Sequence, residues 1–374
     1  MNKKVSVVIP NYNYARFLQR RIDCITNQTM KPSEIIFLDD CSTDDSLIVA
    51  EEILCKTDIP YRIIHNEINQ GVFKQWLKGI ELTQYDYFWI AEADDYCELN
   101  FLEVLLPAFD DEKVALAYCQ SKFVNLKGEI IADEVDYKRK YFSIEHWLSN
   151  YVVSQEFEIL NYLSVINTIP NASAVVFNKQ RINFSEIEIV REYNKAGDWL
   201  FYLTSLGAFV DNKISYDISL LNYYVRHENS AYISNYQKPE LFKELLHIYE
   251  FVLQNYNLTF STNQLIFKQI YDLLLWYDFD FTNESILNSL LGKLGQFSII
   301  KELKCEYHRL TDRINSLTCR LHEAEFKLNK TESSLLLAES KLHETEQSLH
   351  NILTSKSWKI TKPLRIFFKL VGGR

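Results

Sequence analysis

The first 95 residues alternate short, continuous apolar runs with amphipathic segments. Strands are expected at residues 5–9, 35–38, 61–64 and 87–90. Apolar residues at helical spacing fill the intervals, including residues 42–54, where Ser42 or Asp44 is the expected cap, and residues 72–82. Four or five consecutive apolar residues suit a strand covered on both faces, so this rhythm predicts a parallel α/β sheet with right-handed crossovers.

The pattern is less regular after residue 95. Strand signals recur at residues 114–119, 128–132, 174–177 and 214–224. Residues 125–128 suit a hairpin turn, and a short helix is expected at residues 199–206. The second half of the sheet is therefore predicted to be mixed, within one α/β domain of residues 1–232. Residues 233–299 carry Leu, Tyr and Phe at helical spacing and predict a helical appendage.

A heptad pattern begins near residue 300. Its core positions, each seven residues apart, are Tyr307, Ile314, Leu321, Leu328, Leu335, Leu342 and Leu349. Heptads sustained over this length without Pro or Gly are typical of a coiled coil. Residues 300–352 are therefore expected to join copies of the chain into a homo-oligomer of undecided order. A long helix folded back on the rest of the chain is the alternative.

The last segment, residues 353–374, interleaves bulky apolar residues with six basic residues and no acid. Interfacial helices of this composition bury aromatic and aliphatic groups while their cations meet anionic lipid. A basic amphipathic tail that holds the protein at a membrane surface is therefore expected. Docking of the tail on the protein's own surface, or recruitment of a partner enzyme, are the alternatives.

Charge and cysteine content narrow the class of protein. A net charge of −10 disfavours nucleic acid as a partner, because binding to phosphate depends on Lys and Arg. The seven cysteines form no C-x-x-C pair, and no run of 18 apolar residues is present. We therefore expect a cytoplasmic protein with free thiols.

Two acidic clusters stand where predicted strands end. Asp39-Asp40 follows the strand at residues 35–38, and Glu92, Asp94 and Asp95 follow the strand at residues 87–90. Ligands of open α/β sheets bind beyond the carboxyl ends of such strands. Carboxylates crowded there repel one another and lose hydration unless a cation or hydroxyl groups engage them. This placement suggests a metal-assisted nucleotide site.

Four motifs carry a resemblance to a known family. In chain order they are Val5-Ser6-Val7-Val8-Ile9-Pro10-Asn11-Tyr12-Asn13, Leu38-Asp39-Asp40-Cys41-Ser42-Thr43-Asp44-Asp45-Ser46, Asn69-Gln70-Gly71 and Trp89-Ile90-Ala91-Glu92-Ala93-Asp94-Asp95. Together they resemble the nucleotide-binding half of family 2 glycosyltransferases with the GT-A fold, a Rossmann-like mixed sheet flanked by helices. Looser similarity extends over residues 1–232, and residues 357–365 resemble a C-terminal segment of many bacterial glycosyltransferases.

The resemblance implies a donor site for a nucleoside-diphosphate sugar. Pro10 and Tyr12 would line the pocket of the nucleotide base, and Asp40 would accept hydrogen bonds from the base or ribose. Asp39 is expected to bond the helix start near Ser42 instead, a role that a capping carboxylate fills.

The second acidic cluster corresponds to the metal motif of the family. Asp94 would reach the ribose and the metal, and Asp95 would coordinate Mg²⁺ or Mn²⁺ directly. Such an ion stabilises the charge that grows on the departing diphosphate. His227 would bind the diphosphate or the metal, and Asn171 and Ser173 would border the acceptor pocket.

Asp198 is the expected catalytic base. An inverting transfer needs a carboxylate that takes the proton of the acceptor hydroxyl, and Gly197-Asp198-Trp199 resembles the acidic catalytic motif of the family. That motif often has Glu where Gly197 stands. The alternative is that Asp198 only caps the helix that follows it.

The expected function is an inverting glycosyl transfer to a glycan or lipid-linked acceptor in surface-polysaccharide synthesis, on the inner face of the plasma membrane. A sugar nucleotidyltransferase is one rival, although the turn at Pro10-Asn11-Tyr12-Asn13 lacks the Gly-rich loop of that class. A coiled-coil scaffold that binds a nucleotide sugar without turnover is the other.

Overall fold

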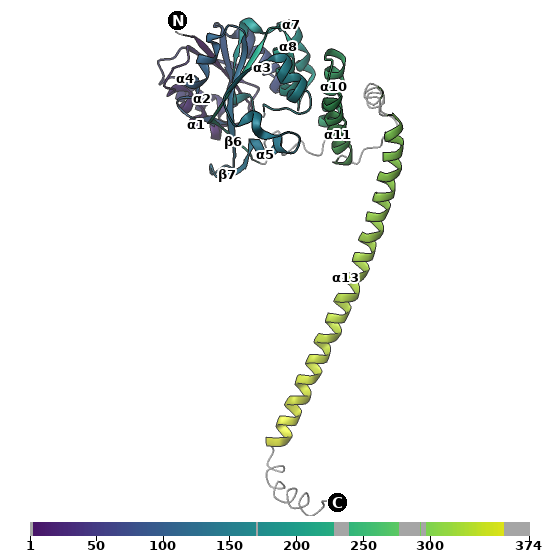
Figure 1. Cartoon of the computed structure of the whole chain (residues 1–374). Coiled ribbons are helices and arrows are strands. Elements are labelled where there is room, and N and C mark those ends of the chain that lie inside the picture. The colour runs from purple at the N-terminus through teal and green to yellow at the C-terminus, as the bar shows by residue number, and fades with distance from the viewer. Residues whose placement is uncertain (1–2, 170, 228–238, 277–291, 293–296, 355–374) are drawn as a thin grey trace, which may run out of the picture. The chain divides into compact units, whose positions relative to one another are not determined.

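A computed structural model describes residues 3–169, 171–227, 239–276, 292 and 297–354 of the chain (Figure 1). The chain divides into two compact units, Met1–Gly295 and Gln296–Arg374, which are described separately below. Most of the predicted basic tail, and the end of the predicted helical appendage, lie outside the described residues. The predicted boundary at residue 232 stays a prediction.

The first unit is built on one sheet, which has ten strands in the described residues. These strands are β1 Val5–Asn11, β2 Glu34–Asp39, β3 Tyr61–His65, β4 Tyr87–Ile90, β5 Tyr96–Cys97, β6 Val114–Val124, β7 Ile130–Asp133, β8 Tyr151–Ser154, β9 Val175–Asn178 and β10 Lys213–Val225. The strand order is β3-β2-β1-β4-β9-β6-β10-β5, with β7 beside β6 and β8 beside β10. Pairs among β1 to β4 are parallel, whereas β9 pairs antiparallel with β4 and β6. The predicted mixed sheet is confirmed.

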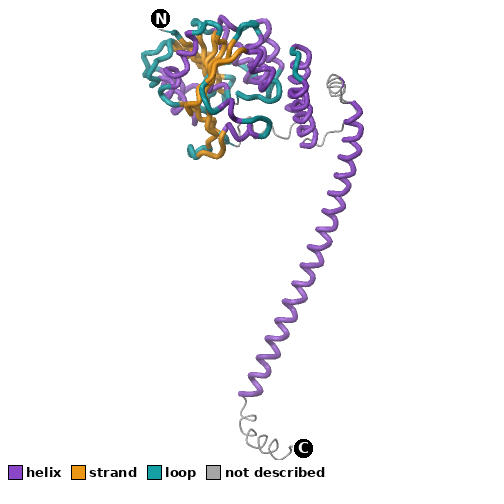
Figure 2. Tube along the Cα trace, viewed as in Figure 1, coloured by secondary structure: helices purple, strands orange, loops and turns teal. Residues whose placement is uncertain are grey.

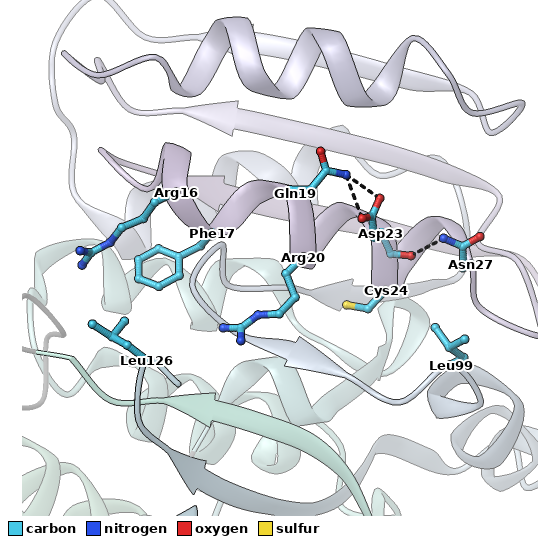
Figure 3. A pocket seen from close by; sticks show the side chains of 9 residues that line it. All are labelled: Arg16, Phe17, Gln19, Arg20, Asp23, Cys24, Asn27, Leu99 and Leu126. Carbon is cyan, nitrogen blue, oxygen red and sulfur yellow. Dashed lines mark hydrogen bonds between the residues drawn. The ribbon is translucent and has the colours of Figure 1, made fainter. Parts of the chain in front are cut away.

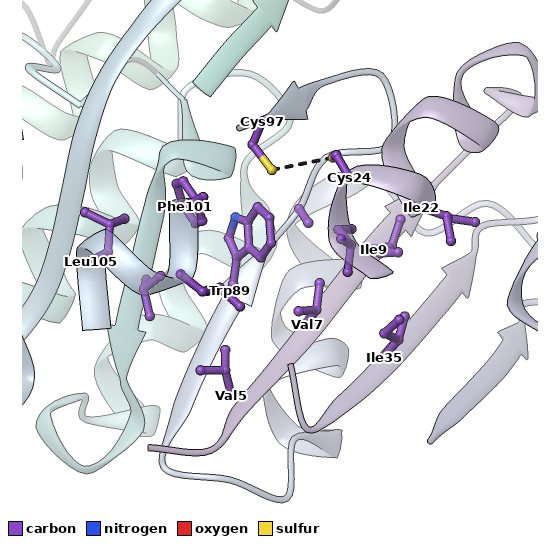
Figure 4. Packing of buried hydrophobic residues seen from close by; sticks show 14 of the residues in the cluster. Val5, Val7, Ile9, Ile22, Cys24, Ile35, Trp89, Cys97, Phe101 and Leu105 are labelled. Atoms are coloured by element: carbon purple, nitrogen blue, oxygen red, sulfur yellow. Dashed lines mark hydrogen bonds between the residues drawn. The ribbon is translucent and has the colours of Figure 1, made fainter. Parts of the chain in front are cut away.

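Helices cover both faces of this sheet (Figure 2). The helices of the first unit are α1 Ala15–Thr26, α2 Ser46–Leu54, α3 Val72–Leu82, α4 Phe101–Leu105, α5 Glu134–Arg139, α6 Gln155–Glu158, α7 Phe184–Ile187, α8 Gly197–Gly207, α10 Pro239–Asn255 and α11 Phe260–Trp276. The larger apolar core joins one face of the sheet to α1, α2 and α4, and Trp89 stacks on Phe101 at its centre, with ring centroids 4.4 Å apart (Figure 4).

The opposite face of the sheet packs against α3. Gly79 permits this close approach, because a Cβ atom at that position would lie 2.3 Å from Cγ1 of Val8 in β1. Adjacent side chains of the sheet, Val8, Ile36 and Leu38, form the small apolar cluster on this face. The carboxyl ends of β1, β2 and β4 consequently stand side by side between two helical layers.

Helix α2 begins later than predicted. It starts at Ser46, and its N-cap residue is Asp45, so the expected start at Ser42 is wrong and neither Ser42 nor Asp44 is the N-cap residue. Asp44 Oδ1 nevertheless accepts from the Ser46 N–H at 3.0 Å. The reason is that earlier backbone groups are bound from outside the helix: Asp39 Oδ2 accepts from the Ser42 N–H at 2.9 Å, and Asn13 Oδ1 accepts from the Thr43 N–H at 2.7 Å. These contacts hold the residues after β2 in a loop.

The second unit contains the 58-residue helix α13, Phe297–Thr354. A helix of this length spans about 87 Å at 1.5 Å per residue. Side chains at five of the heptad core positions, Leu321, Leu328, Leu335, Leu342 and Leu349, are between 55% and 60% exposed. The helix is confirmed, and its assembly into a coiled coil stays a prediction. Among the described residues, no helix is long and apolar enough to cross a membrane.

Candidate active site

Asp39 and Asp40 are adjacent at the end of β2, but their side chains bind different partners. Asp39 is fully buried and accepts hydrogen bonds from Asn11 Nδ2 and the Ser42 N–H, each at 2.9 Å, and its Oδ2 lies 2.9 Å from His65 Nδ1. The expected bond between Asp39 and the segment at Ser42 is confirmed. Asp39 therefore joins β1, β3 and the loop before α2.

Asp40 is saturated by donors from the protein itself. Its side chain is 2% exposed and accepts from Asn66 Nδ2, Gln75 Nε2 and the backbone N–H groups of Gln70 and Gly71, over 2.6 to 3.0 Å. Because Gly71 is the N-cap residue of α3, the carboxylate also satisfies the start of that helix. The expected donor-binding role of Asp40 stays a prediction.

Pro10 and Tyr12 lie at the end of β1 and just beyond it. Pro10 is buried within the strand, whereas Tyr12 is 45% exposed. The Tyr12 ring is thus available to a ligand at this edge of the sheet, as a stacking role requires. Contact of either residue with a nucleotide base stays a prediction.

The second acidic cluster follows β4 and is held by the surrounding side chains. Asp95 is 1% exposed: its Oδ2 accepts from Asn171 Nδ2 and Ser173 Oγ at 2.7 Å, and its Oδ1 accepts from the Val225 N–H at 3.0 Å. Asn171 and Ser173, expected to border an acceptor pocket, thus contact Asp95 directly. Glu92 Oε1 accepts from the indole N–H of Trp76 at 2.7 Å.

Crowding raises the proton affinity of these carboxylates. Burial, followed by the charges of Asp94 and Asp95, raises the pKa of Glu92 to about 8. Burial and the charge of Asp94 also raise the pKa of Asp95. A bound cation would reverse this effect, because it favours the ionised carboxylates. The electrostatics of the cluster therefore favour the binding of a cation.

A buried arginine lies beneath the cluster. Arg21 in α1 is fully buried, and its guanidinium carbon lies 4.9 Å from the centroid of the Trp89 ring. Its charge acts against burial by lowering the pKa values of Glu92 and Asp95. Arg21 is not among the site residues that the sequence predicts, because a basic residue on a helix is ordinarily solvent-exposed. The sequence feature that indicates a buried arginine here is its position among Leu18, Ile22 and Ile25 on the apolar side of α1.

Asp94 pairs with His227, which follows β10. His227 Nε2 lies 3.0 Å from Asp94 Oδ2, and His227 is 3% exposed. The other ring nitrogen, Nδ1, has no hydrogen-bond partner among the described residues. The rings of Tyr14 and Phe17 enclose the imidazole, with centroids 5.6 and 5.0 Å from it. The structure thus brings His227 to the acidic cluster, and its expected binding of the diphosphate or the metal stays a prediction.

Asp198 approaches the same region from α8. Its Oδ2 accepts from Asn167 Nδ2 at 3.0 Å, and its Oδ1 accepts from the Trp199 N–H at 2.8 Å. Burial raises the pKa of Asp198 to about 7. The alternative that Asp198 is the N-cap is wrong, because α8 begins at Gly197 and its N-cap residue is Ala196.

Two tyrosines connect Asp198 electrostatically with the acidic cluster. After burial, the charges of Asp198 and Glu92 are the main causes that hold the pKa of Tyr202 well above its usual value. Asp95, Asp94 and Asp198 all raise the pKa of Tyr224. Helix α3 links them in space, because its Trp76 donates to Glu92 and its Phe73 contacts Gly197, the residue before Asp198. Asp198 and the acidic cluster thus border the same helix.

Comparisons with known proteins identify a family for part of the chain. Residues 6–152 match the family model for glycosyl transferase family 2. Residues 6–152 belong to this family. The chain is 32% identical to glycosyltransferase GlyG of Streptococcus pneumoniae over 105 residues, which are 28% of this chain and 35% of that protein. It is 34% identical to putative glycosyltransferase EpsH of Bacillus subtilis over 108 residues, which are 29% and 31% of the two proteins.

Each of these alignments spans about a third of the relative. A longer match, at 24% identity, covers 81% of this chain and 91% of an uncharacterized glycosyltransferase of Haemophilus influenzae. Among solved structures, S. aureus TarS 1–349 in complex with UDP-GlcNAc has a TM-score of 0.51 at 20% identity, covering 75% of this chain and 74% of that fragment. Mannosyltransferase PcManGT of Pyrobaculum calidifontis, in complex with GDP-Man and Mn²⁺, has a TM-score of 0.51 at 13% identity, covering 79% and 75%. The expected GT-A fold is confirmed.

The residues at the family's metal motif fit a hard divalent cation. In the described part of the chain, no three His, Cys, Asp or Glu side chains converge as ligands. Mg²⁺ sites commonly use only one or two carboxylates, with substrate phosphates and water as the other ligands. Asp94 and Asp95 supply two adjacent carboxylates, and their crowding favours a cation. Which metal they bind, if any, stays a prediction.

A groove of about 840 Å³ adjoins the site along α1 (Figure 3). Its lining residues are Arg16, Phe17, Gln19, Arg20, Asp23, Cys24, Asn27, Leu99 and Leu126. The Arg20 guanidinium lies over the Tyr96 ring, 3.9 Å from its centroid. Phe17 contacts both the groove and His227, so it forms the wall between the groove and the acidic cluster.

Proposed function

We propose that this chain is an inverting glycosyltransferase that moves a sugar from a nucleoside-diphosphate sugar to an acceptor hydroxyl. The observation that carries the proposal is the acidic cluster of Glu92, Asp94 and Asp95 that follows β4. Asp198 stands at the start of α8, which packs against α3, the helix whose Trp76 binds Glu92. Family membership of the N-terminal domain supports the same reaction class. The whole chain's activity is inferred from this domain.

The donor is proposed to lie across the ends of β1, β2 and β4. Tyr12 is exposed at this edge and offers a ring on which a nucleotide base can stack. The loop held by Asp40 would lie along the nucleotide, and the diphosphate would reach Asp94 and His227. The structural neighbours that carry UDP-GlcNAc and GDP-Man support a nucleotide sugar as the ligand.

Asp94 and Asp95 would hold Mg²⁺ or Mn²⁺ together with the diphosphate. When bound, the ion neutralises the charge that develops on the departing nucleotide. The protein keeps Asp95 in place through Asn171, Ser173 and the Val225 N–H. Because both Asp95 oxygens accept hydrogen bonds, its orientation is fixed before a ligand arrives. The Mn²⁺ in the PcManGT complex supports a divalent ion.

Asp198 is proposed to remove the proton of the acceptor hydroxyl. A base works best when its pKa lies near the working pH, and burial raises the pKa of Asp198 to about 7. Asn167 and the Trp199 N–H orient the two carboxylate oxygens. Attack by the deprotonating hydroxyl on the face opposite the leaving diphosphate would invert the anomeric configuration.

The acceptor is proposed to be a glycan or lipid-linked glycan of a surface polysaccharide. We further propose that α13 joins copies of the chain and that the basic tail holds them to the inner face of the plasma membrane. Liposome flotation of the full chain against a chain ending at Ile352 tests the tail. The full chain is expected to float with anionic liposomes and the shortened chain to stay in solution, so equal flotation would contradict the anchor.

A panel of nucleotide sugars tests the proposed reaction. We expect one donor to release nucleoside diphosphate in the presence of Mn²⁺ or Mg²⁺ with a suitable glycan acceptor. Nuclear magnetic resonance of the product should show the anomeric configuration opposite to that of the donor. Binding without release would identify a non-catalytic scaffold, and formation of nucleoside triphosphate and sugar 1-phosphate on addition of inorganic pyrophosphate would identify a nucleotidyltransferase. Retention of configuration would contradict the role of Asp198.

A further inference from the structure

The loop before Asp198 is fastened to α10 by a single carboxylate. Glu244 Oε1 accepts from the Asn194 N–H at 2.8 Å, and Oε2 accepts from the N–H groups of Lys195 and Ala196 at 2.9 and 2.8 Å. Consecutive N–H groups aimed at one point form an anion-binding concavity. Helix α8 has no side-chain cap of its own at Ala196. A distant acid therefore holds the three residues that precede α8.

Helix α3 fixes the opposite side of this loop. A Cβ atom on Gly197 would lie 2.7 Å from Cδ2 of Phe73, so the backbone of α8 begins in direct contact with that ring. Only Gly197 separates Ala196, the last residue bound by Glu244, from Asp198. A shift of the loop would therefore move the Asp198 carboxylate directly.

Helix α10 also holds the second partner of Asp198. The Tyr249 hydroxyl donates to the Val165 carbonyl at 2.9 Å, and its ring meets Trp199 edge-on at a centroid distance of 5.4 Å. Val165 stands two residues before Asn167, which donates to Asp198. The same helix thus restrains both chain segments that orient the Asp198 carboxylate.

We propose that Glu244 is a positioning residue that holds Asp198 in place for proton removal. This inference rests on the proposed function of Asp198 as the base. Glu244 lies in the region that the sequence analysis assigned to a helical appendage after residue 232. That region, through α10, would then complete the active site of the glycosyltransferase domain.

The effect of Glu244 should fall on the chemical step. Proton transfer depends steeply on geometry, and a misplacement of about 1 Å from a distant mutation lowers rates by about 10²-fold. The proposed donor contacts lie at the ends of β1, β2 and β4, which Glu244 does not hold. Loss of Glu244 should therefore lower kcat and leave donor affinity intact.

Steady-state kinetics of full-length variants test the proposal. Glu244→Ala is expected to lower kcat by about tenfold to 10²-fold with a donor Kd within about twofold of wild type. Glu244→Gln, which keeps one acceptor oxygen, should recover part of the loss. Glu250→Gln, on the same helix, is the matched control and should behave like wild type.

The Asp198→Asn variant distinguishes failure of the positioning role of Glu244 from failure of the proposed base. If Asp198→Asn abolishes transfer and Glu244→Ala leaves kcat unchanged, the positioning role is wrong while the proposed base stands. If Asp198→Asn retains full turnover, the proposed base itself is wrong. If Glu244→Ala does not fold, Glu244→Gln tests the proposal instead. The kcat of Glu244→Gln must then fall while its melting temperature stays at the wild-type value. A parallel loss of donor affinity and kcat in that variant would overturn the proposal.

Discussion

Replacing Asp40 with alanine is expected to destabilise the first unit by about 4 kcal/mol. The change leaves the part-buried backbone N–H groups of Gln70 and Gly71 without their acceptor, at about 1.5 kcal/mol each, in the lower part of the range for such groups. The side-chain amides of Asn66 and Gln75 can rotate toward other partners or water, so together they add only about 1 kcal/mol. This total is a large share of the roughly 5–15 kcal/mol that stabilises a typical domain.

Urea unfolding of the full chain, followed by tryptophan fluorescence, measures this effect, because Trp76 and Trp89 report on the first unit. Asp40→Asn keeps the shape but replaces one acceptor by a donor, so it should cost about 2 kcal/mol. Asp45→Ala is the control: Asp45 is exposed and makes no capping bond, so its change should stay within about 0.5 kcal/mol. Equal stability of Asp40→Ala and wild type would contradict the stabilising role of the Asp40 carboxylate. Lost donor binding at unchanged stability would instead identify Asp40 as a ligand contact.

Three further predictions concern the base, the start of α8 and the long helix. Since Asp198 has a pKa of about 7 and must be ionised to accept a proton, kcat should rise with pH up to about 7 and level off above it; a flat profile from pH 5 to 8 would argue against this base. Gly197→Ala should cost about 1–3 kcal/mol by overpacking against Phe73, and Phe73→Leu should recover part of that cost in thermal unfolding. Unchanged melting of the single variant would contradict the packing. Analytical ultracentrifugation should show an oligomer that Leu335→Asp with Leu342→Asp converts to a monomer, whereas a monomeric wild type would exclude the coiled coil.

The sheet and the acidic positions could be predicted because their signals are local. Each of the first parallel strands is a continuous apolar run, and its acids follow within a few residues. Right-handed crossovers make these strands parallel, so their carboxyl ends lie at the same edge of the sheet. The start of α2 was predicted wrongly because Asn13, which binds Thr43, lies 30 residues away in sequence.

The rest of the site depends on contacts that no local pattern records. Glu244 resembles any other acid on an amphipathic helix, and only the fold shows that it meets the backbone 50 residues earlier. Arg21 and Trp76 likewise gain their roles from packing against β4 and Glu92. Such residues have no spacing signature, since tertiary contacts set their partners.

We propose above that Asp198 acts as the base at a metal-dependent donor site. The most direct test compares kcat for sugar transfer by the wild type and Asp198→Asn, with Mn²⁺ and the donor identified from the panel. If Asp198 is the base, the substitution lowers kcat by about 10²- to 10⁴-fold and leaves the donor Kd unchanged. Transfer by Asp198→Asn at the wild-type rate would contradict it.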